Sequence, residues 1–585
     1  METRAAMHPE YSNGLAGSVM ARIEGMRDGE VFVYLFLFVV LTHATLLNLP
    51  YFWDEGGYYI PAARDILNTG TFIPYSTQSG AHPPLSSIYL VVWWKIFGYM
   101  PMVSRIAMLM VSAWALAAVF RIGRRLVNPM VALAATICTL LYPVWFAQSS
   151  LTHADLLAAA CTLWGTAFYL EERAQRAALF FSLAAISKET AIIGSLTLAG
   201  WEFIQWASVV WARHRAAPDA LARFKNPLLT AKAHLQRMAV LLVIPSLPLA
   251  LWYVFHFVRT GHVFANSEFF QYNVAGTLSF ERFALALLQR LWHITAHVNL
   301  FSLTVAAAVA MCFRVRRLTA RRPRPGTAGE IPASQIPAGE ILPGESKARR
   351  RNDPSPDRRP AIRPGALVVI WLLISAYVVT FSVIGGALLT RYLLPIFPLL
   401  MLLEISILWR RIPRWGLVAA LVCGSFAAGL ELNPPYSYAF EDNLAYRDFV
   451  ALHQQAANYI VANYPRKRII TAWTASDEIS IPALGYVTIP AVIMPVDNFS
   501  RQELERLGEK ARFGDAILMF STQYRARGWY MPRYQWWEHS NRKFFDYHQD
   551  LAAEEVASLL GGRIRWKAQR GVLKVAVIDL PHSLH

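Results

Sequence analysis

The sequence predicts an α-helical polytopic membrane protein with a C-terminal α/β domain. Three observations predict it: 55% of the residues are hydrophobic and only 16% charged, long apolar runs recur from residue 31 to about residue 433, and the pattern then changes to alternating helix and strand signals. Soluble domains carry about a quarter charged residues, so this composition indicates a chain whose solvent is mainly lipid. It excludes a disordered, collagen-like or coiled-coil architecture for the chain as a whole.

Eleven apolar runs approach the length that crosses a bilayer, roughly 20 residues for a hydrocarbon core of ~30 Å. They lie near residues 31–49, 103–120, 130–147, 155–170, 177–187, 190–211, 237–257, 285–311, 365–384, 392–409 and 415–432. The fifth run is short, so we expect a broken or tilted helix there. The first run is expected to be a retained anchor, because residues 1–30 are too long and too mixed in charge for a signal peptide.

The distribution of arginine predicts the orientation of these spans. Lys and Arg outnumber Asp and Glu by 56 to 39, giving a net charge of +17, and the arginines lie in short segments between apolar runs. This is the positive-inside pattern of membrane proteins, and it does not indicate nucleic-acid binding. With a cytoplasmic segment 1–30 and eleven spans within a module 31–433, the following residues all face the cytoplasm: Arg121, Arg124, Arg125, Arg173, Arg176, Arg410, Arg411 and Arg414.

Two segments differ from the apolar module. Residues 314–363 are rich in Pro, Gly and Arg without apolar periodicity, which predicts a disordered cytoplasmic loop. Residues 436–585 predict an extracytoplasmic α/β domain that docks the acceptor or packs over the membrane site. Its expected helices are 444–463, 500–511 and 550–560, and its expected strands are 468–473, 485–493, 515–520 and 572–580.

The first loop after an apolar run carries two adjacent acids, Asp54 and Glu55, among aromatic residues that include Tyr58 and Tyr59. Trp and Tyr rings prefer the membrane–water interface, so the loop is expected at headgroup depth. Desolvation and a neighbouring like charge raise the pKa of a carboxyl group there, which suits a general base toward a hydroxyl. The alternative is a pair of solvated loop acids.

The same loop ends at His82, directly before Pro83 and Pro84. The prolines open a short amphipathic helix at about 85–97 that is expected to lie along the interface. His82 is then held at the depth of Asp54, as a candidate for phosphate contact or proton transfer.

Further polar residues occur at the predicted external ends of spans. They are His153, Asp155, Lys188, Glu189, Arg391 and Tyr392. Ionisable groups in or beside a span are costly and are functional candidates by default. The alternative for each is an internal ion pair, such as Lys188 with Asp155 or Arg391 with Glu404. If they converge, carboxylate and cations together suit attack of a hydroxyl on a sugar carried by a lipid phosphate.

These motifs, in this order, resemble the GT-C glycosyltransferases of the protein O-mannosyltransferase and lipid A aminoarabinose transferase type. The resemblance covers about residues 30–410 and rests on Asp54-Glu55, the Pro83-Pro84-Leu85 box, Asp155, Lys188 and Arg391-Tyr392-Leu393-x-Pro395. His82 stands where the aminoarabinose transferases usually have lysine. The resemblance implies a multi-pass enzyme of the bacterial inner membrane, with a periplasmic C-terminal domain, that uses an undecaprenyl-phosphate-linked sugar and inverts the anomeric centre. It further implies that Asp54 is the base, Glu55 its neighbour, and Lys188 and Arg391 phosphate contacts.

The acceptor stays open among a glycan, a lipid and a protein. A polytopic transporter or flippase of envelope lipids is the alternative function, although no pair of similar halves is visible in the sequence. The sequence indicates no particular cofactor and leaves a divalent cation open: Asp54 and Glu55 have the chemistry to bind one, but a phosphate leaving group beside basic residues does not need one. Cys138, Cys161, Cys312 and Cys423 lack CxxC spacing, so neither a disulfide framework nor a zinc site is predicted.

The arginine pattern predicts that residue 340 is cytoplasmic and the C-terminus is external. Alkaline phosphatase fused at 340 should therefore be inactive, and the same reporter fused at 585 should be active. Activity at 340, or inactivity at 585, would contradict the eleven-span topology.

Overall fold

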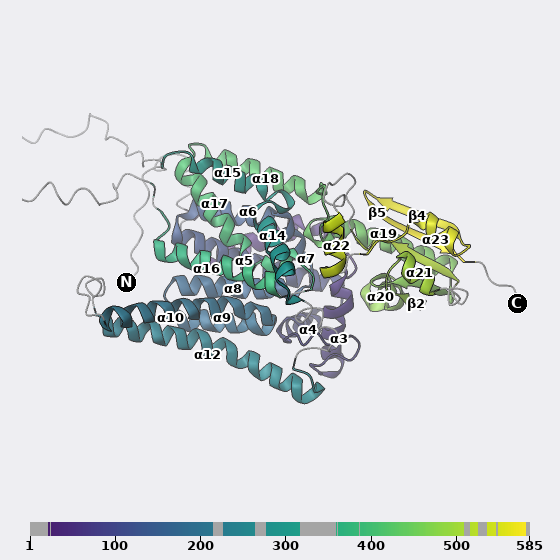
Figure 1. Ribbon diagram of the computed structural model, residues 1–585, viewed down its shortest axis with the longest axis horizontal. Coiled ribbons are helices and arrows are strands. Elements are labelled where there is room, and N and C mark those ends of the chain that lie inside the picture. The colour runs from purple at the N-terminus through teal and green to yellow at the C-terminus, as the bar shows by residue number, and fades with distance from the viewer. Residues whose placement is uncertain are drawn as a thin grey trace, which may run out of the picture.

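The computed structural model describes residues 22–23, 25–214, 226–263, 277–315, 359, 361–384, 386–507, 515–523, 535–545 and 548–580. Most of the predicted N-terminal segment 1–30 and of the predicted loop 314–363 lies outside these residues. The described chain is a bundle of helices with a small sheet at one end (Figure 1).

The bundle consists of helices that largely follow the predicted apolar runs. The helices are α2 (Asp28–Thr42), α5 (Pro101–Leu126), α6 (Pro129–Leu141), α7 (Pro143–Ser150), α8 (Ala154–Leu170), α9 (Ala174–Ser187), α10 (Ile192–His214), α12 (Pro227–Thr260), α14 (Phe280–Thr295), α15 (Phe301–Met311), α16 (Pro364–Val383), α17 (Phe397–Arg411) and α18 (Trp415–Glu431). The short helices α3 (Ile60–Thr69) and α4 (Leu85–Phe97) lie between α2 and α5, so the short helix expected at 85–97 is present.

Two predicted spans are broken rather than continuous. The run 130–147 divides into α6 and α7, which are bent by 68° at Pro143, a residue that lacks the N–H needed to continue the helix ladder. The run 285–311 divides into α14 and α15 with a bend of 100°, and Val298 and Asn299 at the break have φ of 42° and 68°. Both breaks bring backbone and polar side chains to the end of the bundle near the sheet.

By length and composition, three described helices are able to cross a membrane: α5, α12 and α16. The number rises to five if each bent pair counts as one span. The count of eleven spans therefore stays a prediction.

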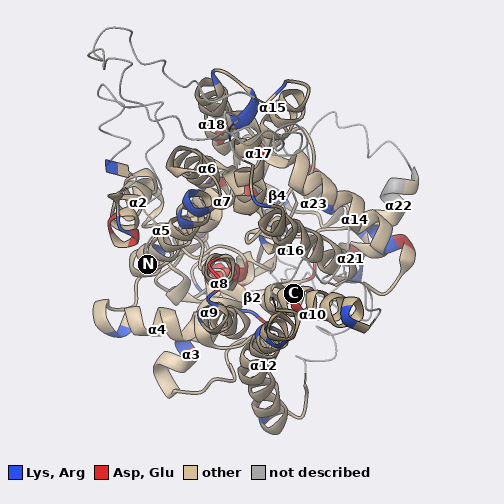
Figure 2. Ribbon diagram, turned by 90° about the vertical axis from the view of Figure 1, so that its left-hand side faces the viewer, with Lys and Arg blue, Asp and Glu red and all other residues tan. Residues whose placement is uncertain are grey.

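Figure 2 views the bundle from the end opposite the sheet and shows Lys and Arg on several helices; α5 and α17 each have two arginines in their last turn. Arg121 pairs there with Asp28 and donates to Glu171 at 2.6 Å, and Arg124 contacts Asp28 at 3.0 Å. These contacts join the start of α2 to the ends of α5 and α8.

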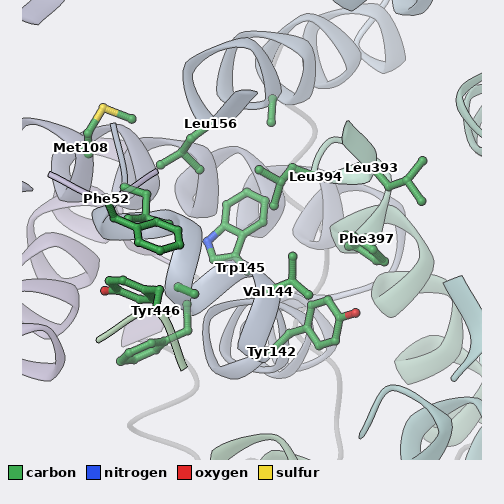
Figure 3. Close-up of a cluster of buried hydrophobic side chains, with 14 of the residues drawn as sticks. Phe52, Met108, Tyr142, Val144, Trp145, Leu156, Leu393, Leu394, Phe397 and Tyr446 are labelled. Atoms are coloured by element: carbon green, nitrogen blue, oxygen red, sulfur yellow. The ribbon is translucent and has the colours of Figure 1, made fainter. Parts of the chain in front are cut away.

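A buried aromatic core holds the sheet-facing half of the bundle together. Trp145 of α7 is fully buried and donates its indole N–H to the hydroxyl of Ser112 at 3.1 Å. Figure 3 shows Trp145 among Phe52, Tyr142 and Phe397, which come from three separate parts of the chain. This core fixes the loops that start and end next to it, and those loops carry the candidate site.

The C-terminal α/β segment follows α18. Its strands are β1 (Arg468–Ala472), β2 (Val492–Val496), β3 (Ala516–Phe520), β4 (Arg563–Arg570) and β5 (Leu573–Asp579), in the order β2-β1-β3-β5-β4. β1 is parallel to both β2 and β3, and β5 is antiparallel to both β3 and β4. The helices are α19 (Ala445–Asn463), α20 (Ala475–Ser480), α21 (Arg501–Leu507), α22 (Gln535–Phe544) and α23 (Ala553–Leu559).

Two features of this sheet differ from the sequence prediction. The strand expected at 485–493 begins only at Val492, after Pro490, which cannot donate to a strand ladder. Strand β4 was not expected. Its residues alternate between exposed and partly buried positions, but the many Arg and Lys residues at the exposed positions make the sequence look like a polar loop. Charged side chains are a common feature of edge strands, where they oppose pairing with other chains.

Helices α5 and α6 approach so closely at Gly123 that a side chain there is expected to destabilise the bundle. A Cβ at Gly123 would lie 2.8 Å from Cα and 2.9 Å from Cβ of Ala132. Gly123→Ala should lower the unfolding temperature of the detergent-purified protein, because overpacking costs ~1–3 kcal/mol and outweighs the better helix propensity of alanine. Gly200→Ala in α10, where nothing lies within 4 Å, is the matched control. Equal unfolding temperatures for the two variants would contradict the close approach.

Candidate active site

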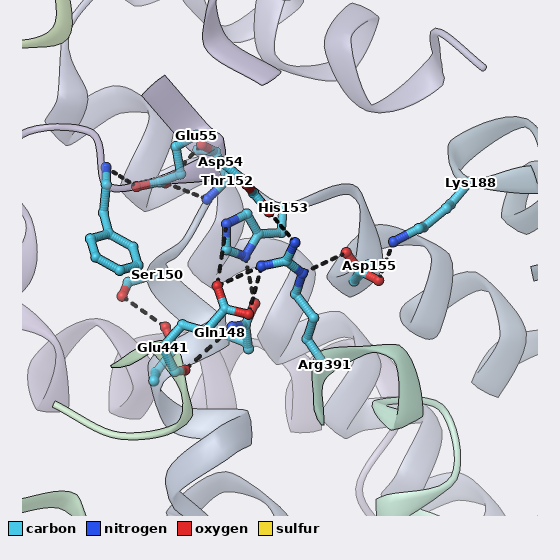
Figure 4. Close-up of polar contacts among 12 residues, drawn as sticks. Asp54, Glu55, Gln148, Ser150, Thr152, His153, Asp155, Lys188, Arg391 and Glu441 are labelled. Carbon is cyan, nitrogen blue, oxygen red and sulfur yellow. Dashed lines mark hydrogen bonds and ion pairs between the residues drawn. The ribbon is translucent and has the colours of Figure 1, made fainter. Parts of the chain in front are cut away.

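Asp54 and Glu55 lie where the chain turns after α2, and their side chains go to different partners. Trp53 has a positive φ of 47°, and a π-helical turn, η3 (Glu55–Tyr59), begins directly after Asp54. The side chain of Asp54 is 19% exposed, whereas that of Glu55 is completely buried. The two adjacent acids therefore do not form one site (Figure 4).

Glu55 is held by a full set of donors. Arg105 of α5 contacts both carboxylate oxygens, and Oε1 also accepts from the backbone N–H and hydroxyl of Thr152 at 2.6 and 2.7 Å. Oε2 accepts from the N–H of Phe52 at 2.7 Å. This pairing ties the loop to α5 and to the start of α8, which places Asp54.

Arg391 is the centre of the second network. It lies in the 3-10 turn η8 (Thr390–Leu393) before α17 and is 3% exposed. Its Nη2 contacts Asp54, its Nη1 donates to both oxygens of Glu441 at 2.6 and 2.5 Å, and its Nε lies 3.4 Å from Asp155. One guanidinium thus joins three carboxylates from three distant parts of the chain (Figure 4).

Lys188 and Tyr392 extend this network. The Lys188 ammonium donates to Oδ1 of Asp155 at 2.6 Å and lies 4.3 Å from the ring centroid of Tyr392. The structure therefore contains the ion pair of Lys188 with Asp155 that the sequence left as an alternative. Arg391 does not pair with Glu404, whose carboxylate lies deeper in α17.

His153 lies against the same network. Its Nδ1 bonds to the side-chain oxygen of Gln148 at 2.8 Å, and its Nε2 is 3.9 Å from Glu441. The ring is 5.8 Å from that of Tyr59. Burial lowers the pKa of His153 well below its ordinary value, and the nearby Arg391 and Lys188 lower it further.

His82 lies beside the network rather than in its centre. Its Nδ1 contacts Oε2 of Glu189 at 2.9 Å, its ring stacks on Tyr59 at 6.2 Å, and its side chain is 29% exposed. The indole of Trp252 in α12 donates to the carbonyl of Ala81 at 2.9 Å and so fixes the backbone before His82. Tyr58 is 40% exposed and faces Trp473 of the C-terminal segment, with 6.0 Å between ring centroids.

The structure thus brings together most of the residues singled out in the sequence. One network contains Asp54, Asp155, Lys188, Arg391 and Tyr392. It is bordered by Tyr59, His82 and His153. Glu55 faces away from it, and Tyr58 lies on the side of the C-terminal segment.

Sequence reasoning missed Glu441 and Asp442, which follow α18 in the short turn η9 (Phe440–Asp442). Glu441 holds Arg391, and Asp442 accepts from Thr390 at 2.9 Å and contacts His297 at 2.8 Å. The available signal was the pair of adjacent acids in the connection after the last apolar run, because the first apolar run is also followed by two adjacent acids.

Arg290 of α14 was missed as well, because it lies inside an apolar run. It is fully buried and donates to the carbonyl oxygens of Leu389 at 2.8 Å and Phe381 at 3.3 Å. Its Nη2 has no hydrogen-bond partner, and within the described part of the chain it forms no ion pair with a carboxylate. Its guanidinium carbon lies 5.9 Å from the ring of Tyr392, which therefore has Lys188, Arg290 and Arg391 around it.

The charges at the site are nearly balanced without a ligand. Three carboxyl groups, those of Asp54, Asp155 and Glu441, face two cations, Arg391 and Lys188, so ionisation of all three would leave one negative charge unmatched. Burial raises the pKa of Glu441 to about 8; Arg391 opposes this shift, and the carboxylate of Asp54 adds to it. Glu441 is therefore the carboxyl group of the network that takes up a proton near neutral pH.

Among the described residues, no group of three or more His, Cys, Asp or Glu side chains is arranged to hold a metal ion. Both oxygens of Glu55 are occupied by protein donors, so Asp54 and Glu55 do not present a joint carboxylate pair to a cation.

Fold and site together define a helical membrane protein with a buried ion network between its bundle and a C-terminal α/β segment. The chain is similar in structure to ArnT from Cupriavidus metallidurans in the apo state, at 14% identity and a TM-score of 0.47, over 95% of this chain and 99% of that one. ArnT from the same organism bound to undecaprenyl phosphate matches at 13% identity and a TM-score of 0.46, over 94% of this chain and 98% of that one. Archaeal oligosaccharyltransferase AglB from Archaeoglobus fulgidus, in complex with an inhibitory peptide and a dolichol-phosphate, matches at 11% identity and a TM-score of 0.41. The match covers 83% of this chain and 69% of that one. No family model and no curated protein matches the sequence.

The raised pKa of Glu441 predicts how stability depends on pH. The folded state holds this proton more tightly than the unfolded chain, where the pKa of Glu is 4.5. The contribution of Glu441 to stability is therefore complete below about pH 4.5, decreases as the pH rises, and is lost above about pH 8. Glu441→Gln should flatten the decrease of the unfolding temperature over this range, whereas Glu554→Gln, an exposed glutamate, should not. An unchanged slope in Glu441→Gln would show that the carboxyl is ionised throughout.

Proposed function

We propose that this protein is an integral-membrane glycosyltransferase that moves a sugar from a polyprenyl-phosphate donor to an acceptor hydroxyl. The observation that carries the proposal is Asp54, a partly exposed carboxylate held by the buried Arg391 at the end of the bundle that faces the C-terminal segment. A base with one side open and the other fixed is what proton removal from a hydroxyl requires.

In the proposed reaction, Asp54 accepts the proton of the acceptor hydroxyl. The acceptor oxygen forms a bond to the anomeric carbon as the bond from that carbon to the phosphate oxygen breaks, and the polyprenyl phosphate leaves with the electron pair. A double displacement would need a carboxylate that attacks the sugar as a nucleophile. Glu55 is not available for this step, because its oxygens accept hydrogen bonds from Arg105 and Thr152. A single displacement with inversion is therefore the mechanism that we infer.

The proposed donor phosphate site is the group of cations around Tyr392. Lys188 and Arg391 are already paired with carboxylates, so a phosphate would have to share them. Arg290 keeps an unpaired Nη2 in a buried position, and a charged donor there forms a strong bond to phosphate. We infer that Arg290 is the principal phosphate ligand, with Lys188, Arg391 and His82 in supporting positions.

The arginine pattern supports an extracytoplasmic position for this site, and we propose that the membrane is the bacterial inner membrane, as the family resemblance implies. The polyprenyl donor then reaches it from the lipid, between helices of the bundle.

Asp54→Asn should abolish transfer while leaving abundance unchanged, because the amide keeps the shape but cannot take a proton; removal of a general base costs ~10²–10⁴-fold in rate. The measurement is mass spectrometry of envelope glycans and lipid-linked sugars in a strain that lacks the protein, complemented with each variant. Asp448→Asn, a carboxylate at the surface of α19, is the control. Near-normal amounts of product from Asp54→Asn would show that Asp54 is not the general base.

Arginine variants should separate donor binding from folding. Arg290→Ala should weaken stabilisation by undecaprenyl phosphate more than tenfold in apparent affinity, since a charge-assisted bond contributes about 1.5–3 kcal/mol. Arg391→Ala should instead lower the unfolding temperature without lipid, because it leaves buried carboxylates unpaired, at a cost of about 3–5 kcal/mol. Thermal unfolding of detergent-purified variants, with and without the lipid, measures both. A wild-type protein that gains nothing from undecaprenyl phosphate would refute the donor site.

A further inference from the structure

The carboxyl end of strand β1 in the C-terminal sheet lies next to the loop that carries the proposed base. Strand β1 lies between β2 and β3 and is parallel to both, so the chain leaves β1 for one side and later returns on the other. The carboxyl end of β1 is therefore a topological switch point. In open α/β sheets, ligands bind outside the carboxyl ends of the strands at such points.

The residues at this switch point are Trp473, directly after β1, and Asp477, in the first turn of α20. Both are half-buried. The Trp473 indole N–H donates to Oδ2 of Asp477 at 3.1 Å, so the ring and the carboxylate have a fixed relation. Behind them, Glu478 accepts from Thr474 at 2.9 Å and contacts His453, which holds the turn in place.

The first loop of the helical module meets this turn. The Trp473 ring is 5.4 Å from that of Trp53 and 6.0 Å from that of Tyr58. Its edge lies so close to Gly57 that a Cβ there would be 2.7 Å from Cζ2 of Trp473. Trp53 directly precedes the proposed base Asp54, so this aromatic surface packs on the loop that carries the base.

We propose that Trp473, Asp477 and Tyr58 form the acceptor subsite and that its ligand is a saccharide, either a free glycan or the sugar of a glycolipid. This inference rests on the proposed transferase function and specifies the substrate class of the same site. The C–H face of a sugar ring packs on an aromatic ring, and its hydroxyls donate to a carboxylate; Trp and Tyr supply such rigid, amphipathic surfaces. An extended peptide would instead pair with an edge strand, which in this sheet is β2 or β4; β1, whose carboxyl end carries Trp473, is paired on both sides.

The test uses the full-length protein in a strain that lacks it, with mass spectrometry of saccharides, glycolipids and tryptic peptides from the envelope. Wild type should restore a sugar-sized mass increment on a saccharide or glycolipid. Trp473→Ala and Gly57→Ala should each reduce it more than tenfold at equal abundance, the first by removing the ring and the second by displacing it. Trp536→Ala, which removes an exposed indole on α22, should restore it fully.

A second measurement separates this inference from the proposed function. Detergent-purified Trp473→Ala should gain as much thermal stability from undecaprenyl phosphate as wild type does, because the donor site is intact. An increment on tryptic peptides, or normal products from both Trp473→Ala and Gly57→Ala, would overturn the saccharide subsite while leaving the transferase intact. Loss of lipid stabilisation in wild type, together with normal products from Asp54→Asn, would overturn the transferase itself.

Discussion

The candidate site depends on one interaction, the contact of the buried Arg391 guanidinium with the carboxylates of Asp54, Asp155 and Glu441. These residues lie after α2, in α8, before α17 and after α18, so the contact joins the beginning, middle and end of the helical module. A buried charge without partners is strongly destabilising, so each of these segments has to be in place before the others are stable. The geometry of the proposed base follows from this shared arginine.

The sequence predicted individual residues better than their partners. Asp54, Lys188 and Arg391 were recognised because ionisable groups at the ends of apolar runs are rare. Their pairing was not predictable, since the distance between residues 54 and 391 is a property of helix packing. Arg105 and Arg290 were not recognised at all, because a single arginine inside an apolar run does not show whether it faces a carboxylate, as Arg105 does, or only carbonyl groups.

The same difference between local and long-range information applies to the fold. Apolar length predicted most helices, and Pro143 gave a visible reason for the break between α6 and α7. The break at Val298 has no such marker in the sequence, because its backbone conformation is imposed by neighbours: the N–H of Val298 donates to the hydroxyl of Tyr436, 138 positions further along. Strand β4 was likewise hidden, since only its pairing with β5 identifies it.

The short turn η9 has a consequence for how the chain divides into independent parts. Both oxygens of Glu441 accept from Arg391, and the adjacent Asp442 contacts His297 and accepts from the hydroxyl of Thr390. Both acids belong to the connection that leads into α19, not to any bundle helix. A protein shortened at residue 433 would keep every apolar run and yet leave Nη1 of the buried Arg391 without the two carboxyl oxygens that accept from it. We therefore expect the helical module to be fully stable only together with the connection to α19, which is synthesised after the last hydrophobic segment.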